Sequence, residues 1–583
     1  MVWVTEFLLS IPGRFVPFLR WIGELRDRDT LKADILAGIT VALVLVPQSM
    51  AYAQLAGLPP YVGLYASFLP PIVAAFFGSS RQLATGPVAV VSLMTAAALG
   101  PLASSNPDGY LAYAMILAIL VGLFQMSLGL LRLGVVVDLL SHPVVVGFTN
   151  AGALIIATSQ LGKLFGVTAP QAEHHYETVY NTILAALDHT HGPTLLMGIV
   201  AIAIMLLLKR YYPKVPSVLA AVVVTTLASW LLDFEAGGGG VVGSIPQGLP
   251  SITIPVFDFE VVKQLITSAV IISLIGFMEA IAIAKAMAAQ TRQRLDTNQE
   301  LVGQGISNLV SGLFTGYPVS GSFSRSAVNI NAGAKTGFSS IVTGIVVGIT
   351  LLFLTPLLYH LPTATLGAVI ILAVINLIKA TPVIHAWKAQ PQDGVVSVIT
   401  FALTLYLAPH LEGGILTGVV LSLLLFVIRT MRPRVAVLSR YKDGSMRDIS
   451  VHPLPTSDTI SLLRFDGSLY FANAGYFENK ILKEVASKPK LRYIVVDASG
   501  INHIDATGEE VLHHLAERLK ATGIELVFAG MKKQFMDVIR RTRLIEFMQE
   551  DHFFSGVQKA LDYVWDSLGD EYDRTKCPLY RES

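Results

Sequence analysis

Charged residues are scarce in this sequence of 583 residues. Asp, Glu, Lys and Arg together make up 14% of it, whereas about 25% is usual in soluble domains. Hydrophobic residues reach 53% and the mean hydropathy is +0.60, which is more apolar surface than a water-soluble fold can bury. The net charge of +1 gives no overall field that favours nucleic acid or acidic partners. The composition predicts an integral membrane protein in contact with lipid, without a nucleic-acid partner.

Cysteine is nearly absent, since Cys577 is the only one in the chain. One thiol excludes a disulfide within the chain and a metal site built from several thiolates. Four histidines in the long external loop 167–192 could suggest a metal site: His174, His175, His189 and His191. They lack matching thiolates and the ordered spacing of a zinc site, so we favour the interpretation that they belong to an irregular loop without a metal. The absence of a Walker A motif argues against ATP-driven pumping by this chain. We expect no metal, no organic cofactor and no enzymatic activity.

Long apolar segments dominate the chain before residue 431. A helix that spans a bilayer needs about 20 mostly apolar residues, because backbone polar groups find no partners in lipid. The clear segments are 35–55, 112–131, 195–208, 215–232, 265–289, 341–358, 395–407 and 415–428. Shorter ones lie between them, at 62–77, 88–99, 144–165, 301–314, 327–334 and 364–378. The pattern predicts about fourteen transmembrane helices, some of them short by the usual length criterion.

The placement of basic residues predicts how these helices are oriented, since cytoplasmic loops carry an excess of Lys and Arg. Three long loops, 101–110, 167–192 and 233–260, contain neither, as expected of external loops. With the N-terminus inside, the following residues are inside as well: Arg81, Arg132, Lys209, Arg210, Lys214, Arg292, Arg294, Lys335, Lys379, Lys388 and Arg429. Lys163 and Lys263 are the exceptions. Both termini are then cytoplasmic, and the amphipathic N-terminal segment lies at the membrane surface.

Two halves of opposite orientation follow from this arrangement, because an odd number of helices in the first half reverses the second. Such transporters bind substrate near the bilayer midplane, where short segments interrupted by Gly and Pro meet. The third segment of the first half begins at Gly86-Pro87, and that of the second half follows the Gly/Pro-rich stretch 316–321. Each is predicted to be a half-helix whose N-terminal amides face an anion. The alternative is that both are ordinary breaks in longer helices.

Two charged residues inside the predicted helices are candidates for function, because ionisable groups are costly in a membrane. Glu279 lies in the middle of a segment and can bind a proton or help to ligate a cation. Arg325 lies among serines, and its fork of donors suits a tetrahedral oxyanion. Alternatively, Glu279 is a neutral or Arg-paired structural group, and Arg325 pairs with it or caps a helix. Gln48 and Tyr52 offer polar contacts either to the anion or to helix packing.

Four stretches of the sequence resemble the SulP family of sulfate permeases and anion exchangers. They are 46–53 (VPQSMAYA), 57–65 (GLPPYVGLY), 85–92 (TGPVAVVS) and 321–329 (GSFSRSAVN). The likeness extends over nearly the whole chain, and several long motifs in the right order are more specific than one short pattern. The resemblance implies an α-helical polytopic fold of about fourteen helices in two inverted seven-helix repeats. It also implies a core and a gate, a homodimer, and an elevator-like movement.

The resemblance further implies roles for individual residues. Ser324 and Arg325, with the backbone near the start of the first half-helix, would hold the anion. The complete set of expected anion contacts is Gln48, Tyr52, Val88, Ala89, Ser324 and Arg325. Glu279 is the expected coupling acid, with H+ favoured as the coupling ion and Na+ as the alternative. The serines around Arg325 look more like those of proton-coupled sulfate carriers than of bicarbonate carriers, whose corresponding acid is usually tied to sodium.

From about residue 445 the sequence changes to alternating strands and helices, which predicts a small soluble α/β domain. Strands are predicted at 461–465, 468–471, 493–496 and 525–528, and helices at 476–485 and 507–520. The stretches 495–500 and 505–508 resemble the STAS domain, in which a loop at a helix N-terminus can accept phosphate. Thr507 is the only hydroxyl there, either as a regulatory phosphorylation site or, as we favour, as a plain helix N-cap. A cytosolic regulator is the partner that such a domain would take.

The predicted organisation is a cytoplasmic amphipathic N-terminus at 1–33, a transport domain at 34–431, a linker at 432–449, a STAS domain at 450–570 and a tail at 571–583. The predicted function is secondary active transport of an inorganic oxyanion in a plasma or bacterial inner membrane, with sulfate uptake by proton symport favoured. The alternatives within this class are sodium-coupled uptake of bicarbonate or dicarboxylate, and anion exchange. Two alternatives belong to a different class. An uncoupled anion channel predicts conductance without coupling, and a sensor whose output is the STAS domain predicts an output that does not depend on Arg325.

Overall fold

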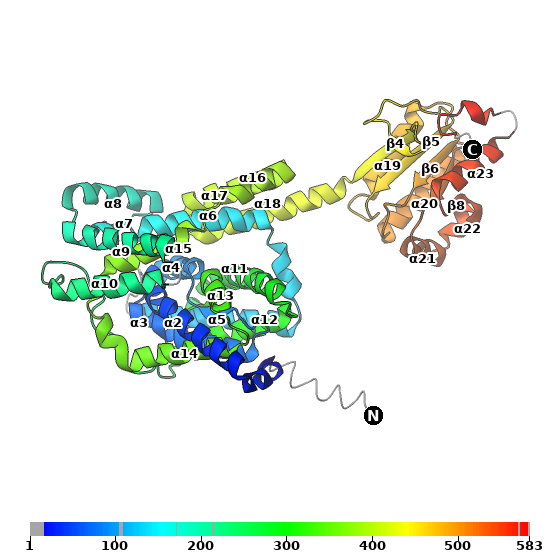
Figure 1. Ribbon diagram of the computed structural model, residues 1–583. Helices are drawn as coiled ribbons and strands as arrows, with labels where there is room; N and C mark the ends of the chain where they lie inside the picture. Colours follow the sequence, from blue (N-terminus) through cyan, green and yellow to red (C-terminus); the bar gives the residue numbers. More distant parts are fainter. Residues whose placement is uncertain (1–16, 104–108, 171, 213–214, 570–571, 581–583) are drawn as a thin grey trace. The chain divides into compact units, whose positions relative to one another are not determined.

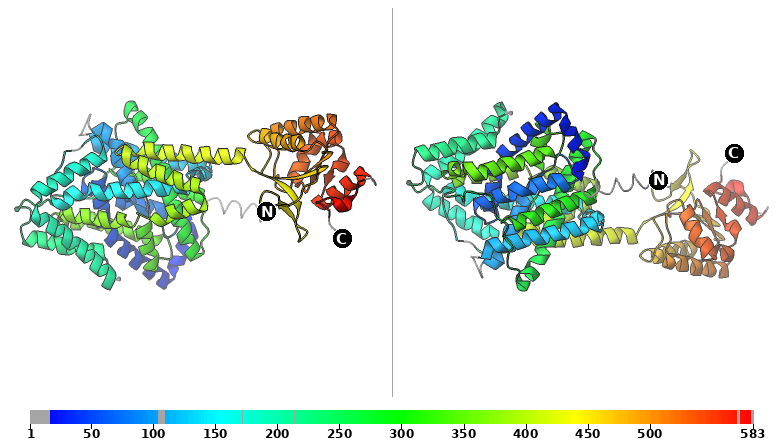
Figure 2. Two further views of the ribbon diagram at one scale, coloured as in Figure 1. Left: turned by 90° about the horizontal axis from the view of Figure 1, so that it is seen from above. Right: turned by 90° about the horizontal axis from the view of Figure 1, so that it is seen from below.

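The computed structural model of the protein describes residues 17–103, 109–170, 172–212, 215–569 and 572–580. The chain divides into two compact units, one that ends at Ser422 and one that begins at Leu423. The first is built almost entirely of helices and the second is an α/β domain (Figure 1 and Figure 2). Residues 1–16 of the predicted N-terminal segment, and parts of the predicted tail, lie outside the described residues.

The helices of the first unit overlap every predicted apolar segment. They are α2 (Arg28–Leu55), α3 (Pro60–Phe77), α4 (Ala89–Ala103), α5 (Tyr110–Leu130), α6 (His142–Ser159), α7 (Leu161–Phe165), α9 (Gly192–Tyr211), α10 (Ser217–Leu231), α11 (Phe259–Thr291), α12 (Thr297–Leu313), α13 (Phe323–Asn331), α14 (Phe338–Ile349), α15 (Thr363–Ile375), α16 (Ala380–Ala389), α17 (Pro391–Leu407) and α18 (Leu411–Met431). After α14 the chain continues through a π-helical and a 3-10 turn as far as Leu358. Within the described ranges, nine helices are long and apolar enough to cross a membrane.

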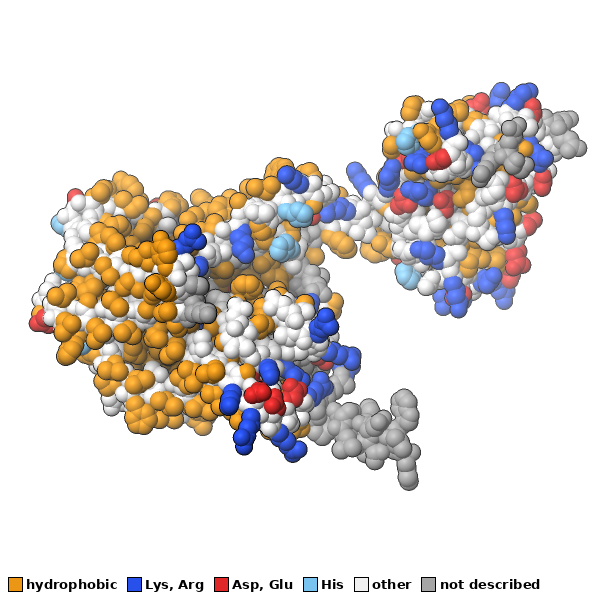
Figure 3. Space-filling view, viewed as in Figure 1, with side chains coloured by type: hydrophobic (Ala, Val, Ile, Leu, Met, Phe, Trp, Pro, Cys, Tyr) orange, Lys and Arg blue, Asp and Glu red, His pale blue; other side chains and the backbone are white. Residues whose placement is uncertain are grey.

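The outer surface of the first unit is apolar. Figure 3 shows hydrophobic side chains over most of the visible face of this unit, while its charged side chains gather at the end where α2 begins. Large apolar residues on this surface include Leu36, Leu206, Leu231 and Phe353, whose exposed fractions are 64%, 50%, 72% and 69%. Contiguous apolar surface of this kind is unfavourable in water and suits a hydrocarbon surrounding.

The helices of the first unit form two groups. In one group α12 packs against α3 and α5, and α14 packs against α2 and α3. In the other, α17 packs against α6, and α15 packs against α7 and α9. We call α2 to α5 with α11 to α14 the core group, and α6 to α10 with α15 to α18 the gate group. Each group takes helices from both halves of the chain.

Glycine allows close contacts between helices of the core group. A Cβ atom at Gly122 of α5 would lie 2.6 Å from the carbonyl oxygen of Gly305 in α12, which is closer than real Cβ atoms approach. Small residues let helix backbones meet, and van der Waals packing of this kind holds helices together in lipid.

Segment 167–192 is not the irregular loop that we predicted, because it contains helix α8 (His175–His189). Glu177 in its first turn provides a capping interaction. The histidine at its start has a structural contact, since His175 Nε2 lies 2.8 Å from Thr158 Oγ1. Burial lowers the pKa of His175, which keeps this ring neutral at physiological pH.

The second unit contains a six-stranded sheet in the order β4-β3-β5-β6-β7-β8. The strands are β3 (Arg434–Arg440), β4 (Met446–Asp448), β5 (Ile460–Asp466), β6 (Tyr493–Asp497), β7 (Glu525–Ala529) and β8 (Phe553–Phe554). β3 is antiparallel to β4 and β5, while β5 to β8 are parallel. The helices are α19 (Ala474–Ser487), α20 (Ala506–Ala521), α21 (Lys533–Arg541), α22 (Leu544–Met548) and α23 (Val557–Leu568). Helices α19 to α22 cover one face of the sheet and α23 covers the other.

The structure corrects two predictions for this unit. Segment 432–449, predicted to be a linker, contains β3 and β4, which extend the sheet beyond β5. Apolar residues of β3 point alternately into two cores, Ala436 into one and Val437 into the other, so the strand lacks a solvent-facing polar side. Residues 468–471 do not form the predicted strand, because Leu469 makes only an isolated bridge.

Candidate anion-binding site

Two short strands bring distant parts of the core group together. β1 (Ala84–Gly86) runs antiparallel to β2 (Ser320–Ser322), with Thr85 opposite Gly321. β1 leads into α4 and β2 leads into α13, so the two predicted half-helices begin close to one another. The first N–H groups of a helix lack acceptors within it, and the helix dipole is positive at this end. The meeting point therefore attracts an anion.

The side chain of Arg325 lies at this meeting point and is fully buried. None of its Nε, Nη1 and Nη2 atoms has a hydrogen-bond partner among the described residues. A Cβ atom at Gly86 would lie 3.4 Å from Nη2, so the guanidinium lies over the end of β1. A buried cation without acceptors is costly, and an oxyanion bound here would offset that cost. The arrangement can therefore hold a tetrahedral anion by charge-assisted hydrogen bonds.

The two half-helices supply neutral donors around this cation. Val88 and Ala89 at the start of α4 are buried. Ser322 is the N-cap of α13, and its Oγ accepts from the backbone N–H of Arg325 at 3.5 Å. Ser324 is exposed, and its Oγ lies 3.4 Å from that of Ser322. Ser324 is thus next to Arg325 in the chain but exposed where Arg325 is buried. Val88 and Ala89 lie at the start of the half-helix that follows the paired strand β1.

Three further predicted residues belong to the neighbouring helices α2 and α11, and two of them, Tyr52 and Glu279, interact with Arg325. Gln48 and Tyr52 of α2 are both 5% exposed, and Gln48 Oε1 receives no hydrogen bond from any described residue. Glu279 of α11 is half-buried, and Arg325 interacts electrostatically with it and with Tyr52. No hydrogen bond joins Glu279 to Arg325, so the structure does not show the direct pairing of the alternative interpretation. Both groups remain available to other ligands.

A buried tyrosine that the sequence analysis did not single out belongs to the same cluster. Tyr317 is fully buried and interacts electrostatically with Arg325 and Tyr52. Its hydroxyl lies 3.0 Å from Ser92 Oγ, which connects the stretch before β2 to α4. In the sequence, only the Gly/Pro-rich stretch 316–321 pointed to this region. The folded chain is needed to show that the side chain of Tyr317 in this stretch points inward.

Polar side chains of α12 hold the two strands in place. Asn308 Oδ1 accepts from the backbone N–H of Val319 at 2.8 Å, and its Nδ2 donates to the carbonyl of the same residue at 3.0 Å. Gln304 Nε2 donates to Thr85 Oγ1 at 2.9 Å. These contacts satisfy backbone and hydroxyl groups that a short two-stranded sheet leaves unpaired, and they fix the position of Arg325 indirectly.

Replacing Gly86 with alanine should reduce anion uptake roughly tenfold, equivalent to about 1.4 kcal/mol. The backbone of Gly86 has φ +154°, which residues with a side chain rarely adopt, so alanine would strain the end of β1, where its Cβ would also touch Arg325 Nη2. Uptake into liposomes by the purified variant would measure the effect. Gly100→Ala in α4 is the matched control, since a Cβ there meets nothing within 4 Å. Equal uptake by both variants would show that the guanidinium does not need this space.

Thr507 in the second unit is not the helix N-cap that we favoured. The N-cap of α20 is Asp505, whose Oδ1 accepts from the backbone N–H of Gly508 at 2.8 Å. Its other oxygen accepts from the backbone N–H of Phe471 at 2.9 Å. Thr507 is exposed in the first turn of the helix, and its proposed phosphorylation stays a prediction.

Comparison with known proteins agrees with this organisation. The model of the Sulfate permease family matches residues 31–400, and that of the STAS domain matches residues 453–560. The chain is 37% identical to "Sulfate transporter 4.1, chloroplastic" of Arabidopsis thaliana, over 94% of this chain and 83% of that protein. It is 33% identical to a probable sulfate transporter of Mycobacterium tuberculosis, over 92% of this chain and 95% of that protein.

Solved structures show the same fold. The murine Solute Carrier 26 family member A9 anion transporter in the inward-facing state matches with a TM-score of 0.88 and 26% identity, over 96% of this chain and 95% of that chain. The transmembrane domain of the cyanobacterial bicarbonate transporter BicA shares the fold with a TM-score of 0.58 and 24% identity, over 67% of this chain and 97% of that chain. The predicted fold class is confirmed. The chain belongs to the sulfate permease family, a family of transporters, and is a multi-pass membrane protein that carries a STAS domain.

Proposed function

We propose that the protein is a secondary transporter that brings sulfate into the cell together with a proton. The observation that carries this proposal is the fully buried guanidinium of Arg325, which has no hydrogen-bond partner among the described residues and lies where two half-helices begin. A tetrahedral oxyanion offsets the cost of burying this cation, because its oxygens accept charge-assisted hydrogen bonds from the guanidinium. The names of the Arabidopsis and Mycobacterium relatives, which are sulfate transporters, support sulfate as that anion.

Glu279 provides the coupling in this proposal. Its charge acts on Arg325 without a hydrogen bond between the two side chains. Ionised Glu279 repels sulfate and competes with it for the field of the arginine, whereas protonated Glu279 does neither. Proton and sulfate therefore favour the binding of one another, and this reciprocal coupling makes inward flow depend on the proton gradient.

The grouping of the helices supports an elevator-like movement. Both half-helices, the β1–β2 pair and α11 with Glu279 belong to the core group, so the whole site can move as one body against the gate group. Alternating access in repeat-built transporters commonly takes this form. We further propose a homodimer with cytoplasmic termini in a plasma or bacterial inner membrane. The STAS domain would begin at β3, earlier than residue 450.

Uptake of radiolabelled sulfate into proteoliposomes tests the proposal. Uptake should rise when the exterior is acidified and should resist competition by bicarbonate and chloride. A sodium gradient in place of the pH gradient should have no effect. Sulfate uptake driven by sodium, exchange with internal anion without a gradient, or conductance without coupling would each contradict proton symport.

A further inference from the structure

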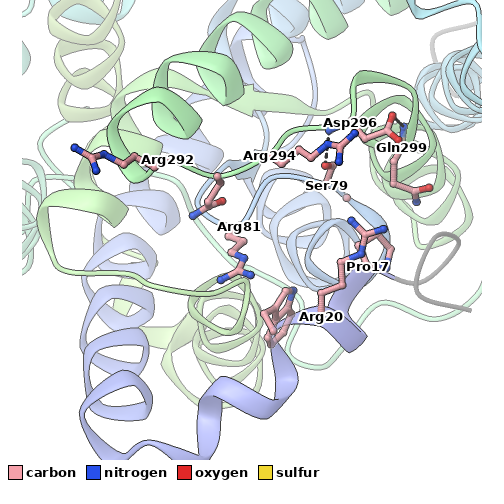
Figure 4. A pocket seen from close by; sticks show the side chains of 11 residues that line it. Pro17, Arg20, Ser79, Arg81, Arg292, Arg294, Asp296 and Gln299 are labelled. Carbon is pink, nitrogen blue, oxygen red and sulfur yellow. Dashed lines mark hydrogen bonds between the residues drawn. The ribbon is translucent and has the colours of Figure 1, made fainter. Parts of the chain in front are cut away.

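A cavity of about 410 Å³ lies in the first unit, apart from the anion site described above. Three segments form its walls: the 3-10 helix Pro17–Arg20 with the next residue, the turn between α3 and β1, and the connection between α11 and α12. The lining residues are Pro17, Arg20, Trp21, Gly78, Ser79, Arg81, Arg292, Gln293, Arg294, Asp296 and Gln299. Four of them are arginines and one is an acid, so the cavity carries a positive charge (Figure 4).

The acidic residues nearby do not neutralise all of this charge. Arg81 Nη1 forms an ion pair with Glu24 at 2.9 Å. Asp296 instead caps α12, since its Oδ1 accepts from two backbone N–H groups at 3.0 and 3.1 Å. Arg20 and Arg294 are exposed and form no ion pair within the described part of the chain. In Figure 4 the side chain of Arg292 extends away from the other three arginines. Arg20, Arg81 and Arg294 therefore make up the basic part of the cavity.

Apart from the ion pair of Arg81 with Glu24, the walls of the cavity are held by contacts that do not involve the arginines. Trp21 is 4% exposed, and the ring of Phe18 packs edge-on against Phe76 at 5.0 Å between centroids. Gln293 Nε2 donates to Gln82 Oε1 at 2.8 Å, and Gln299 Nε2 donates to the carbonyl of Phe77 at 2.7 Å. The fold is thus secured by apolar and neutral polar contacts, so the excess of positive charge is free to serve a ligand.

The surroundings of the cavity indicate the source of that ligand. Leu19 and Ile22, on either side of Arg20 and Trp21, are each 47% exposed. The positive charge predicts that this end of the unit faces the cytoplasm. Exposed apolar residues next to a basic hollow fit a phospholipid whose acyl chains lie against the protein while its phosphate enters the hollow. Arginine forks bind phosphate oxygens with good geometry.

We propose that this cavity binds a phosphate group, supplied by the headgroup of an anionic phospholipid. The cavity shares no lining residue with the candidate anion site, and the proposal does not depend on the identity of the transported anion. Arg20 from the N-terminal segment and Arg294 from the α11–α12 connection would clamp the phosphate from two sides. A bound lipid would thereby tie the segment before α2 to the end of α11 in the core group.

Titration of the detergent-solubilised full chain with short-chain phosphatidylglycerol tests this proposal, with the shift in melting temperature as the signal and phosphatidylcholine as the neutral control. At constant ionic strength the wild type should be stabilised by phosphatidylglycerol only. In the double variant Arg20→Gln/Arg294→Gln, the concentration for half-maximal shift should rise on the order of 30-fold, since each basic side chain contributes roughly fivefold. Lys209→Gln/Arg210→Gln at the end of α9 removes the same charge elsewhere and should behave like the wild type.

A titration with inorganic phosphate distinguishes the two possible ligands of the cavity, which are the phosphate of a lipid headgroup and a soluble phosphate ion. A saturable shift with inorganic phosphate, also lost in the double variant, would support the phosphate site with a soluble anion as its ligand. An unchanged titration in the Arg20/Arg294 variant, or an equal loss in the Lys209/Arg210 variant, would overturn the proposal. The single variant Arg294→Gln, measured first in phosphatidylcholine alone, reports whether the fold is retained and should show an intermediate loss.

Discussion

Replacing Arg325 with alanine should weaken sulfate binding about 100-fold or more and reduce uptake to background. Hydrogen bonds to charged groups contribute roughly 1.5–3 kcal/mol each, and the guanidinium offers at least two of them to a tetrahedral anion. In the structure all three of its nitrogens lack partners among the described residues, so nothing else competes for them. Sulfate-dependent thermal stabilisation and proteoliposome uptake would measure binding and transport separately.

Two companion variants separate binding from a structural role. Arg325→Lys keeps the charge but loses the planar fork, and should retain weak binding. Arg325→Met keeps much of the volume without the charge. Because the buried guanidinium is unpaired, its removal should not lower the melting temperature in the absence of sulfate, and sulfate should no longer raise it. A Met variant that unfolds more easily without sulfate would mean that the arginine serves the fold instead of the anion. Arg210→Met, on the exposed end of α9, is the control.

The membrane helices could be predicted from the sequence because the bilayer imposes one simple requirement on them. Each apolar segment had to become a helix, and for the nine long helices length and hydropathy suffice to recognise them. Helix α8 escaped prediction because its stability comes from local capping and partial packing, which apolar length does not report. β3 was missed although Val435 to Leu438 form a short apolar run, because four apolar residues between charged ends are too few to distinguish a strand with two buried faces from a linker.

The candidate site was predictable only in part. Glu279 and Arg325 are conspicuous because charge is rare in a membrane segment. Tyr317 and Asn308 are ordinary residues in sequence, and they acquire a role because the fold pairs β1 with β2, which lie more than 200 residues apart. Thr507 shows the opposite case, in which a helix start was recognised but the wrong side chain was chosen as its cap. A single sequence does not show which of its distant segments pair with one another in the fold.

Replacing Glu279 with glutamine should abolish the dependence of sulfate uptake on an imposed pH gradient while sulfate binding is retained. Glutamine has the shape of the protonated acid but cannot release a proton, so the site would permanently resemble its proton-loaded state. Sulfate binding near neutral pH should be as tight as in the wild type or tighter, because repulsion between the carboxylate and the anion is removed. Binding measured across pH, together with uptake with and without an acidic exterior, tests this expectation.

A second variant, at a distant acid on the same helix, separates the effect of losing the Glu279 carboxylate from the effect of losing any negative charge on α11. Glu260→Gln at the exposed start of α11 removes one charge without touching the cluster around Arg325, and should leave gradient-driven uptake intact. If liposomes with the Glu279→Gln variant still accumulate sulfate in response to the pH gradient, another group must carry the coupled proton. Glu279 would then be only a neighbour of the anion. If the variant loses binding altogether, the carboxylate is needed to position Arg325. We expect the variant to lose coupling and keep binding, because Glu279 interacts electrostatically with Arg325 but is not hydrogen-bonded to it.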